Sequence, residues 1–409
     1  MSNIADVAAP SQQVHAQQKE ASNTDLLSEF LNLCDQNKAN TYDIDFFKTV
    51  FKLCRPETTS KFSYYAELEE HIAYIESFAA SELISNQLNF VAPLLELTAT
   101  MGNSHSSLNP HSSYNPHNPH NPHNNTENPK LAQQLLSSIR QGEMLFSRVL
   151  TIPEQAKNST QAPFGVSASE NKHGWLLNGA LNVVLFNKAV SHHLVLATLP
   201  NNNTLVTYLP TQTAGITTVE HAQLGAPKAN NTQFEIANLK LQNVLINNGA
   251  IGEINTQAIL DLVTRSRIMT AIRHNQYTRM CLDKLILFLK SRISNGDPLI
   301  NQQVIQHRLA KLEARLSSSC ALSRYSLKQM AVGKDTQALA SASKLLASEL
   351  LVYTSKQALH LGGITHFQKN KPIANSYTEA NWANFFLEPK ELLLRNILDT
   401  SVSERHQKA

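Results

Sequence analysis

The sequence contains little cysteine and little excess charge. Its four cysteines form no close pair, so neither a disulfide framework nor a zinc site is predicted, and we interpret each as a small buried apolar residue. They are Cys34, Cys54, Cys281 and Cys320. With 35 basic and 32 acidic residues the formal net charge is only +3, and no long basic run indicates a nucleic-acid partner.

Long apolar segments and an N-terminal leader are also missing. The longest apolar runs, such as Leu285–Leu289, are far too short for a bilayer, which needs about 20 consecutive apolar residues. No charged-then-apolar segment opens the chain, so we expect a cytoplasmic protein without a membrane span. Apolar residues still make up 42% of the 409 positions, which is enough for two or three domains with real cores.

The N-terminal part divides into a tail and a helical domain. Residues 1–24 are polar and show no periodicity, which predicts a disordered tail. Apolar residues recur at helical spacing through 25–101, which predicts an N-terminal helical domain. A second short tail is expected at the other end, over 401–409.

Residues 102–129 carry a repeated Asn-Pro-His triplet and are predicted to be irregular, because frequent proline is incompatible with helix and sheet interiors. In a polyproline helix the histidines of the tandem repeats, His117, His120 and His123, would share one face and could bind a divalent metal. The alternative is a loop expanded by repeat slippage. We favour the loop and predict no metal, because ordering a flexible segment on binding costs conformational entropy.

The middle of the chain changes from helical to strand periodicity. After a predicted helix at 131–150, short apolar segments separated by turn residues occur at 174–179, 194–197 and 205–209. This pattern predicts a domain over 130–250 that combines a helix with a small β-barrel or sandwich.

Residues 251–400 return to helical periodicity and are predicted to form an antiparallel four-helix bundle. The first helix is expected to stop at the turn Asn295–Pro298, and Asp335 with Thr336 can cap the third. The last is predicted to start at Glu388-Pro389, where the missing N–H of proline has no helical partner to lose. The fold class is therefore α+β and multidomain, with helices on both sides of a β-domain.

Several fixed points in this bundle resemble the C-terminal domain of the acyl-CoA dehydrogenase family. They are Arg267, the run Arg292-Ile293-Ser294-Asn295-Gly296, Gln303, the step Leu361-Gly362-Gly363, and the segment Phe386-Leu387-Glu388-Pro389-Lys390. Upstream, Gly142-Glu143 and Thr151-Ile152-Pro153 resemble landmarks of the family's middle domain. The resemblance covers about residues 131–400, and the N-terminal helices match by position alone.

The resemblance implies that Glu388 is the catalytic base and that Arg267 lies beside the active site. In the family, this glutamate removes a proton from the α-carbon of a thioester, which requires a carboxylate in an apolar surround. Some branches of the family place the base directly before the bundle arginine, but Ser266 occupies that position here. The alternative is that Glu388, like Glu391, only favours the positive end of the following helix.

The resemblance also implies FAD as the cofactor. Thr151 matches a flavin-ring contact, Arg292 and Gln303 would meet the cofactor of a neighbouring subunit, and Gly362 with Gly363 completes the set. The substrate would be an acyl-CoA or similar thioester in fatty acid metabolism, and an electron-transfer flavoprotein could accept the electrons. The consecutive apolar residues at Leu285–Leu289 favour a homodimer or homotetramer built through the bundle.

Several flavin-contact positions depart from the family pattern. The family's tryptophan that packs on the flavin ring and its threonine that bonds to the ring are replaced by Val183 and Leu185. Residues 154–158 stand in place of its glycine-serine-aspartate turn. Ile152 replaces an acidic residue, Asn295 a phenylalanine, and Thr365 a glycine. Each lost contact is worth roughly 1 kcal/mol or more, so several together could abolish tight binding.

Three functions follow from these observations. The first is an acyl-CoA dehydrogenase-like oxidoreductase that uses Glu388 as its base. The second is a flavin-free relative that keeps the fold and acts as a binding or regulatory protein. The third is a flavin-dependent monooxygenase on the same fold, which would not need Glu388.

Overall fold

The computed structural model describes residues 29, 32–33, 44–54, 62–73, 75, 78–104, 128–149, 164–220, 235–247, 250–366, 376–377, 380–384 and 388–408. The predicted tail at 1–24, most of the Asn-Pro-His segment including His117, His120 and His123, and Thr151 lie outside these residues.

The N-terminal helices contribute to two apolar cores. These helices are α2 (Ile44–Leu53), α3 (Phe62–Ile72), α4 (Phe78–Asn86), the π-helical turn η1 (Gln87–Val91), α5 (Ala92–Ser104) and α6 (Pro129–Arg140). Helix α5 extends to Ser104, slightly into the segment predicted to be irregular. Gly102 does not stop the helix, because a glycine there costs only about 1 kcal/mol relative to alanine. Asn128 caps α6 by accepting a hydrogen bond from the Leu131 N–H at 3.0 Å, with Pro129 as the first helical residue.

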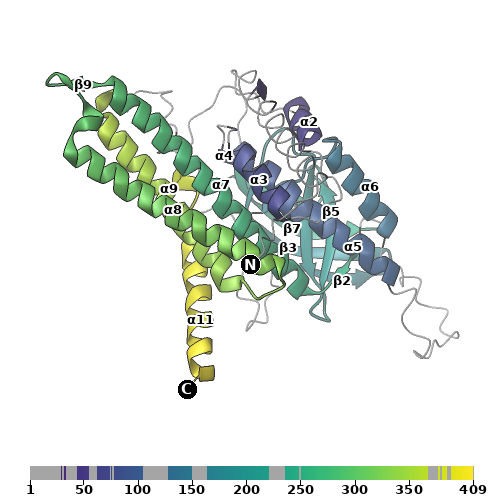
Figure 1. The fold of residues 1–409 in the computed structure, drawn as a ribbon. Helices are drawn as coiled ribbons and strands as arrows, with labels where there is room; N and C mark the ends of the chain where they lie inside the picture. Colours follow the sequence, from purple (N-terminus) through teal and green to yellow (C-terminus); the bar gives the residue numbers. More distant parts are fainter. Residues whose placement is uncertain are drawn as a thin grey trace, which may run out of the picture.

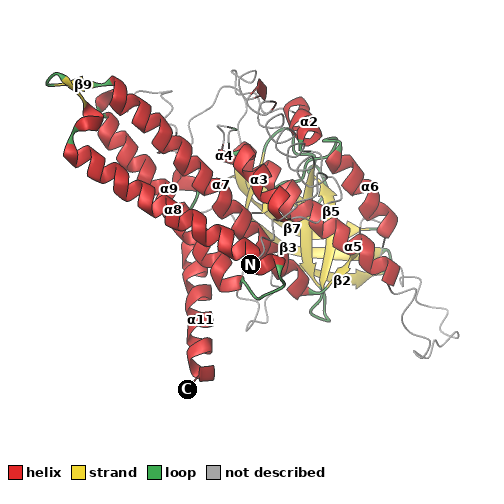
Figure 2. Ribbon diagram, viewed as in Figure 1, coloured by secondary structure: helices red, strands yellow, loops and turns green. Residues whose placement is uncertain are grey.

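A single mostly antiparallel sheet follows, in the order β6-β7-β3-β2-β4-β5-β8 with β1 paired to β3. Its strands are β1 (Arg148–Val149), β2 (Val166–Asn171), β3 (Gly174–Phe186), β4 (His192–Thr198), β5 (Thr204–Pro210), β6 (Ile216–Glu220), β7 (Glu235–Ile246) and β8 (Ala250–Ile254). Strand β2 pairs in parallel with β4 at Ser167 and Thr198. The three short apolar segments predicted to be strands, 174–179, 194–197 and 205–209, lie in β3, β4 and β5 (Figure 2).

The C-terminal part is built around the long helix α7 (Thr256–Ser291), which at 1.5 Å per residue extends for roughly 54 Å. It runs from the sheet to the far end of the bundle, where β9 lies (Figure 1). Helices α8 (Gln303–Ala331) and α9 (Gln337–Gly362) pack beside it. Helix α11 (Lys390–Lys408) packs on α9, projects away from the bundle, and covers most of the predicted 401–409 tail.

A two-residue hairpin joins β9 (Ile293–Ser294) to β10 (Asp297–Pro298) at the end of α7. Asn295 and Gly296 have φ angles of 55° and 84°. A tight hairpin turn of this kind needs positive φ at both central residues, which Asn-Gly supplies at low cost. This explains why an asparagine stands here in place of the family's phenylalanine.

The predicted α+β architecture, with helices, a β-domain and a helical bundle in this order, is confirmed. The boundaries proposed between the domains remain predictions. Within the part of the chain that the structure describes, none of the helices has both the length and the apolar character needed to cross a bilayer.

Candidate active site

The two residues predicted to be catalytic meet in the structure. Arg267 lies on α7, and Glu388 lies just before α11, 121 positions later. The Nε of Arg267 donates to Oε2 of Glu388 at 2.6 Å, and its Nη2 donates to Oε1 at 2.5 Å. This is a bidentate pair between a planar guanidinium and a carboxylate, the strongest common form of charged hydrogen bonding.

Burial makes this pair different from a surface ion pair. Arg267 and Glu388 are each only 1% exposed. Two charges withdrawn from water in this way are stable only when paired closely, so removing either partner alone would leave a buried charge uncompensated. The alternative that Glu388 is a solvated residue at a helix start is therefore wrong, because its side chain is buried and bonded to α7.

A third charged residue reaches the same place from α9. Lys344 is fully buried, and its Nζ donates to the main-chain carbonyl oxygen of Glu388 at 2.7 Å. The sequence did not lead us to predict a role for this residue. A signal was present, because Lys344 is a lone charged residue on a stripe of small and apolar residues at helical spacing, between Ala340 and Ala347.

The ion pair restricts how Glu388 can act as a base. Both carboxylate oxygens accept hydrogen bonds from Arg267. A carboxylate held in this way would have to turn at least one oxygen away from Arg267 in order to face a substrate carbon.

A second buried ionic cluster lies two turns further along α7. Arg273 donates to Glu69 of α3 and to Glu82 of α4, and all three side chains are fully buried. His274 approaches Glu82 at 4.0 Å and lies within hydrogen-bond distance of Ser348 Oγ, at 3.0 Å.

Opposing effects act on the charges of this cluster. Burial lowers the pKa of Arg273, but Glu69 and Glu82 outweigh it and leave the pKa raised. Burial dominates at Glu69, whose pKa is raised despite the lowering by Arg273. The cluster ties α7 to the N-terminal helices and was not predicted from the sequence.

The residues proposed to bind a cofactor lie elsewhere, at the end of the bundle that carries β9. Arg292 and Gln303 are both exposed there, at the end of α7 and the start of α8. Gly362 and Gly363 end α9, and Gly363 adopts a φ of 64° with open space on its side-chain face. A Cβ on Gly362 would collide with the ring of His366, which lies over it.

The exposed residues at the end of the bundle fit the pyrophosphate part of a cofactor site, but Leu185 does not fit the flavin-ring part. Exposed arginine and glutamine donors suit the pyrophosphate of a dinucleotide held by another subunit. At the position of the ring-bonding threonine, Leu185 is 1% exposed and belongs to the apolar core around α2 to α4. This side chain offers no hydrogen bond to a ring. The side chain of Val183 and residue Thr151 lie outside the described residues.

Metal and thiol chemistry have no visible basis in this region. In the described ranges, no group of three or more His, Cys, Asp or Glu residues is arranged to hold a metal ion. Burial raises the pKa of the Cys281 thiol to about 12 and raises that of Cys54 as well. These two thiols therefore remain protonated at neutral pH and are unreactive.

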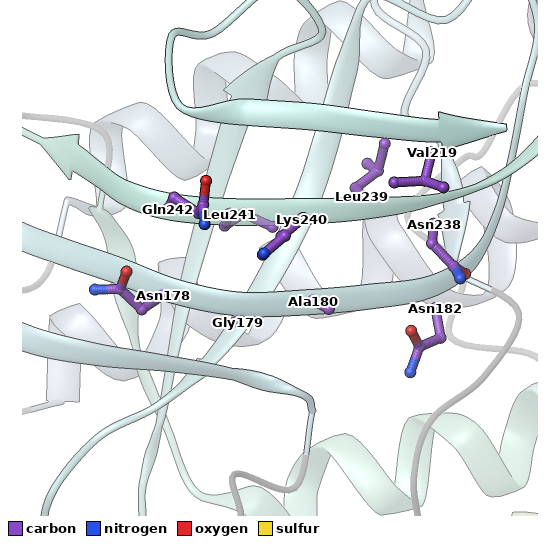
Figure 3. Close-up of a pocket in the computed structure, with 10 residues that line it drawn as sticks. All are labelled: Asn178, Gly179, Ala180, Asn182, Val219, Asn238, Leu239, Lys240, Leu241 and Gln242. Carbon is purple, nitrogen blue, oxygen red and sulfur yellow. The ribbon is translucent and has the colours of Figure 1, made fainter.

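An open groove of about 530 Å³ lies on the sheet, away from the Arg267–Glu388 pair. Residues from β3, β6 and β7 line it, as Figure 3 shows. Apolar residues such as Val219, Leu239 and Leu241 lie there beside four amides and Lys240, the amides being Asn178, Asn182, Asn238 and Gln242. None of the predicted site residues lines this groove.

The succession of helical, β-sheet and helical-bundle parts is that of the acyl-CoA dehydrogenase fold. Butyryl-CoA dehydrogenase from Megasphaera elsdenii superposes with a TM-score of 0.72 at 16% identity, over 93% of this chain and 98% of that one. A glutaryl-CoA dehydrogenase from Mycobacterium smegmatis, in complex with FADH2, gives 0.72 at 15% identity over 93% and 94%. At these identities the similarity shows the fold alone.

A family model matches the bundle. Residues 256–401 match the model described as "Acyl-CoA dehydrogenase, C-terminal domain". A 3-(aryl)acrylate reductase of Clostridium sporogenes is a distant relative, 24% identical over 258 residues. That match spans 60% of this chain and 66% of the reductase, slightly under two thirds of its length. The resemblance inferred from the sequence is confirmed.

Proposed function

We propose that this protein is an FAD-dependent oxidoreductase that acts on the α,β-carbons of an acyl-CoA or similar thioester. The observation that carries the proposal is the buried contact between Arg267 and Glu388, the two residues that the family resemblance places at the active site. In this mechanism Glu388 takes a proton from the α-carbon after a bound substrate has loosened its contact with Arg267. FAD, when bound, would accept the hydride that leaves the β-carbon.

The same residues could also serve the reverse reaction. The relative from Clostridium sporogenes is named as a reductase of 3-(aryl)acrylates. Reduction of such a double bond requires a proton donor at the α-carbon, and a protonated Glu388 would supply it. The substrate class in the proposal therefore includes α,β-unsaturated acyl groups as well as saturated ones.

The cofactor would be held between two copies of the chain. Arg292 and Gln303 are exposed at the end of the bundle and would meet the pyrophosphate of a neighbouring subunit's FAD. Large exposed apolar residues gather at the same end, which supports an interface there. They are Leu287, Ile293, Val304 and Ile364. A homotetramer, a cytoplasmic location, a role in fatty acid metabolism and an electron-transfer flavoprotein partner are further parts of the proposal.

A non-catalytic relative is the second candidate. It is supported by Leu185, which is apolar and buried where the flavin ring would need a hydrogen bond, and by the fully bonded carboxylate of Glu388. In this alternative the Arg267–Glu388 pair is purely structural and the chain acts by binding a partner.

Flavin loading distinguishes the two candidates. We expect the purified protein, after incubation with FAD and removal of free cofactor, to retain flavin absorbance and to lose it when acyl-CoA is added without oxygen. Arg292→Ala should lower the bound FAD, whereas Arg308→Ala, which removes an exposed arginine from the side of α8, should not. A protein that stays colourless after FAD is added would support the non-catalytic candidate instead.

A further inference from the structure

Lys344 is an unusual residue in the described core, because a lysine ammonium is rarely fully buried. Removing this charge from water is unfavourable, so its contacts have to compensate. The contact that defines its position is a hydrogen bond of 2.7 Å from Nζ to the carbonyl oxygen of Glu388. The ammonium therefore contacts the main chain of the proposed base, while the side chain of that base is bonded to Arg267.

Glu388 is thus held at two points by cations from two helices. Arg267 on α7 binds the carboxylate, and Lys344 on α9 binds the main-chain carbonyl. Each contact controls a different part of the residue. The carboxylate contact can be broken by rotation of the side chain, whereas the carbonyl contact fixes the backbone from which that side chain extends.

The next residue makes the carbonyl contact more important. The peptide between Glu388 and Pro389 is planar, and proline contributes no N–H to it. The carbonyl oxygen of Glu388 is therefore the only hydrogen-bonding group of this peptide. Lys344 orients it, and the ring of Pro389 crowds the preceding residue and so restricts the ψ angle of Glu388. Together they fix the direction in which the Cα–Cβ bond of Glu388 leaves the backbone.

We propose that Lys344 is a positioning residue for Glu388. By holding the carbonyl of Glu388, Lys344 sets the position from which the carboxylate reaches the α-carbon of a bound thioester once it leaves Arg267. This inference rests on the proposed function.

A purely structural role for Lys344 would be to tie α9 to the start of α11. The chain contains a matched control for that role, because Lys390 of α11 forms an ion pair with Glu349 of α9. The pair between Lys390 and Glu349 joins the same two helices two residues further along. Its side chains are 44% and 42% exposed and bond to each other. Lys344→Met and Lys390→Met therefore separate positioning of Glu388 from attachment of α11.

Hydrogen exchange is the first measurement, and it needs no cofactor or activity. In the full-length protein, we expect Lys344→Met to raise the exchange rate of the backbone amides in the first turn of α11 by about tenfold or more. Lys390→Met should change these amides much less, because an exposed pair contributes little. Equal exchange in wild type and Lys344→Met would overturn the anchoring of this backbone.

Steady-state kinetics is the second measurement. With flavin content equal to wild type, we expect Lys344→Met to lower kcat by about 10- to 100-fold and to leave KM within about threefold, because a displaced base affects the chemical step more than binding. Lys390→Met should retain nearly full kcat. Where the Met variant does not fold, Lys344→Gln tests the same contact, since its amide is one bond too short, and the same loss of kcat is expected.

The outcomes distinguish this inference from the proposed function. An active wild type with an equally active Lys344→Met variant overturns the inference alone. A wild type that reduces no flavin with acyl-CoA overturns the proposed function and, with it, the positioning role of Lys344. Equal losses of kcat in Lys344→Met and Lys390→Met would show that Lys344 only attaches α11.

Discussion

Several buried polar residues join elements that lie far apart in the sequence. Alongside the residues around Glu388, His193 of β4 is only 3% exposed and is hydrogen-bonded through Nδ1 to Ser147 Oγ at 2.8 Å. Burial, with a smaller contribution from His192, lowers the pKa of His193 from 6.5 to about 4. His193 is therefore neutral in the folded protein at pH values where the unfolded chain would already bind a proton.

This difference predicts a pH dependence of stability. Because the folded pKa is the lower one, the unfolded state binds more protons between pH 4 and 6.5, so stability is lost as pH falls through this window. A shift of this size corresponds to about 3 kcal/mol. His193→Asn keeps an acceptor for Ser147. Between pH 6.5 and pH 4, its free energy of unfolding should fall by about 3 kcal/mol less than that of wild type. Urea unfolding across this range is the measurement.

A matched variant controls for the other groups that titrate in the same range. His173 lies exposed in the turn between β2 and β3, and His173→Asn should follow the wild-type profile. A profile for His193→Asn that coincides with wild type would contradict the assigned cause.

At the scale of elements, α7 organises the molecule by contacting all of its parts. Its first turns pack on the sheet side, its middle carries Arg267 and Arg273, and its last turns form the apolar core at the end of the bundle. The Arg273 cluster attaches α7 to α3 and α4. The position of Arg267, two turns earlier, depends on that attachment.

Removing Arg273 should therefore be far more costly than removing a surface arginine. Arg273→Leu leaves Glu69 and Glu82 buried together without a counter-charge, and we expect it to lower the free energy of unfolding by about 3–5 kcal/mol. Arg324→Leu is the control, because Arg324 also joins the bundle to α3, through Glu70, but is 70% exposed. That variant should lose less than about 1 kcal/mol. Urea midpoints of the two variants make the comparison.

A triple variant tests the cause of the destabilisation. Combining Arg273→Leu with Glu69→Gln and Glu82→Gln removes every charge from the trio, so part of the lost stability should return. If the triple variant is less stable than Arg273→Leu alone, repulsion between the two carboxylates is not the cause.

At the scale of the whole molecule, periodicity predicted the helices and strands well, because burial of apolar faces determines both. The stop at Asn295-Gly296 was predicted as a turn, and the structure adds that it is a hairpin. The contact between Arg267 and Glu388 could not be derived from periodicity, since 121 residues separate them and only the packing of α11 against α9 brings them together. The family resemblance implied that both residues lie at the active site, but it did not imply an ion pair between them.

Lys344 and Arg273 were missed for a related reason. Each is a charged residue on a helix face that otherwise carries apolar or small residues. Such a residue only breaks the apolar periodicity, so the pattern does not indicate a role for it. Their partners, a main-chain carbonyl and two glutamates from other helices, are visible only in three dimensions.

The exposed apolar residues at the end of the bundle predict an oligomer. Leu287 is 66% exposed and Ile364 is 85% exposed, although both are large apolar residues. We expect wild type to be a dimer or tetramer at micromolar concentration by light scattering, and Leu287→Asp with Ile364→Asp to lower the mass. Val332→Asp, at the opposite end of α8 and 68% exposed, should not change it. A wild-type monomer would remove this part of the proposal.

The central claim is that Glu388 is the base of a flavin-dependent acyl-CoA oxidoreductase. Its most direct test is the rate of flavin bleaching by acyl-CoA without oxygen, compared among wild type, Glu388→Gln and Glu391→Gln at equal flavin content. Glu391 is an exposed carboxylate in the first turn of α11, so its variant makes the same chemical change outside the site. Circular dichroism of the same samples verifies folding, because Glu388→Gln also removes the counter-charge of Arg267.

We predict that Glu391→Gln bleaches at the wild-type rate and that Glu388→Gln bleaches about 10²- to 10⁴-fold more slowly, the usual contribution of a well-placed base. A Glu388→Gln variant that bleaches as fast as wild type, or a wild-type protein that binds no flavin, would contradict the claim.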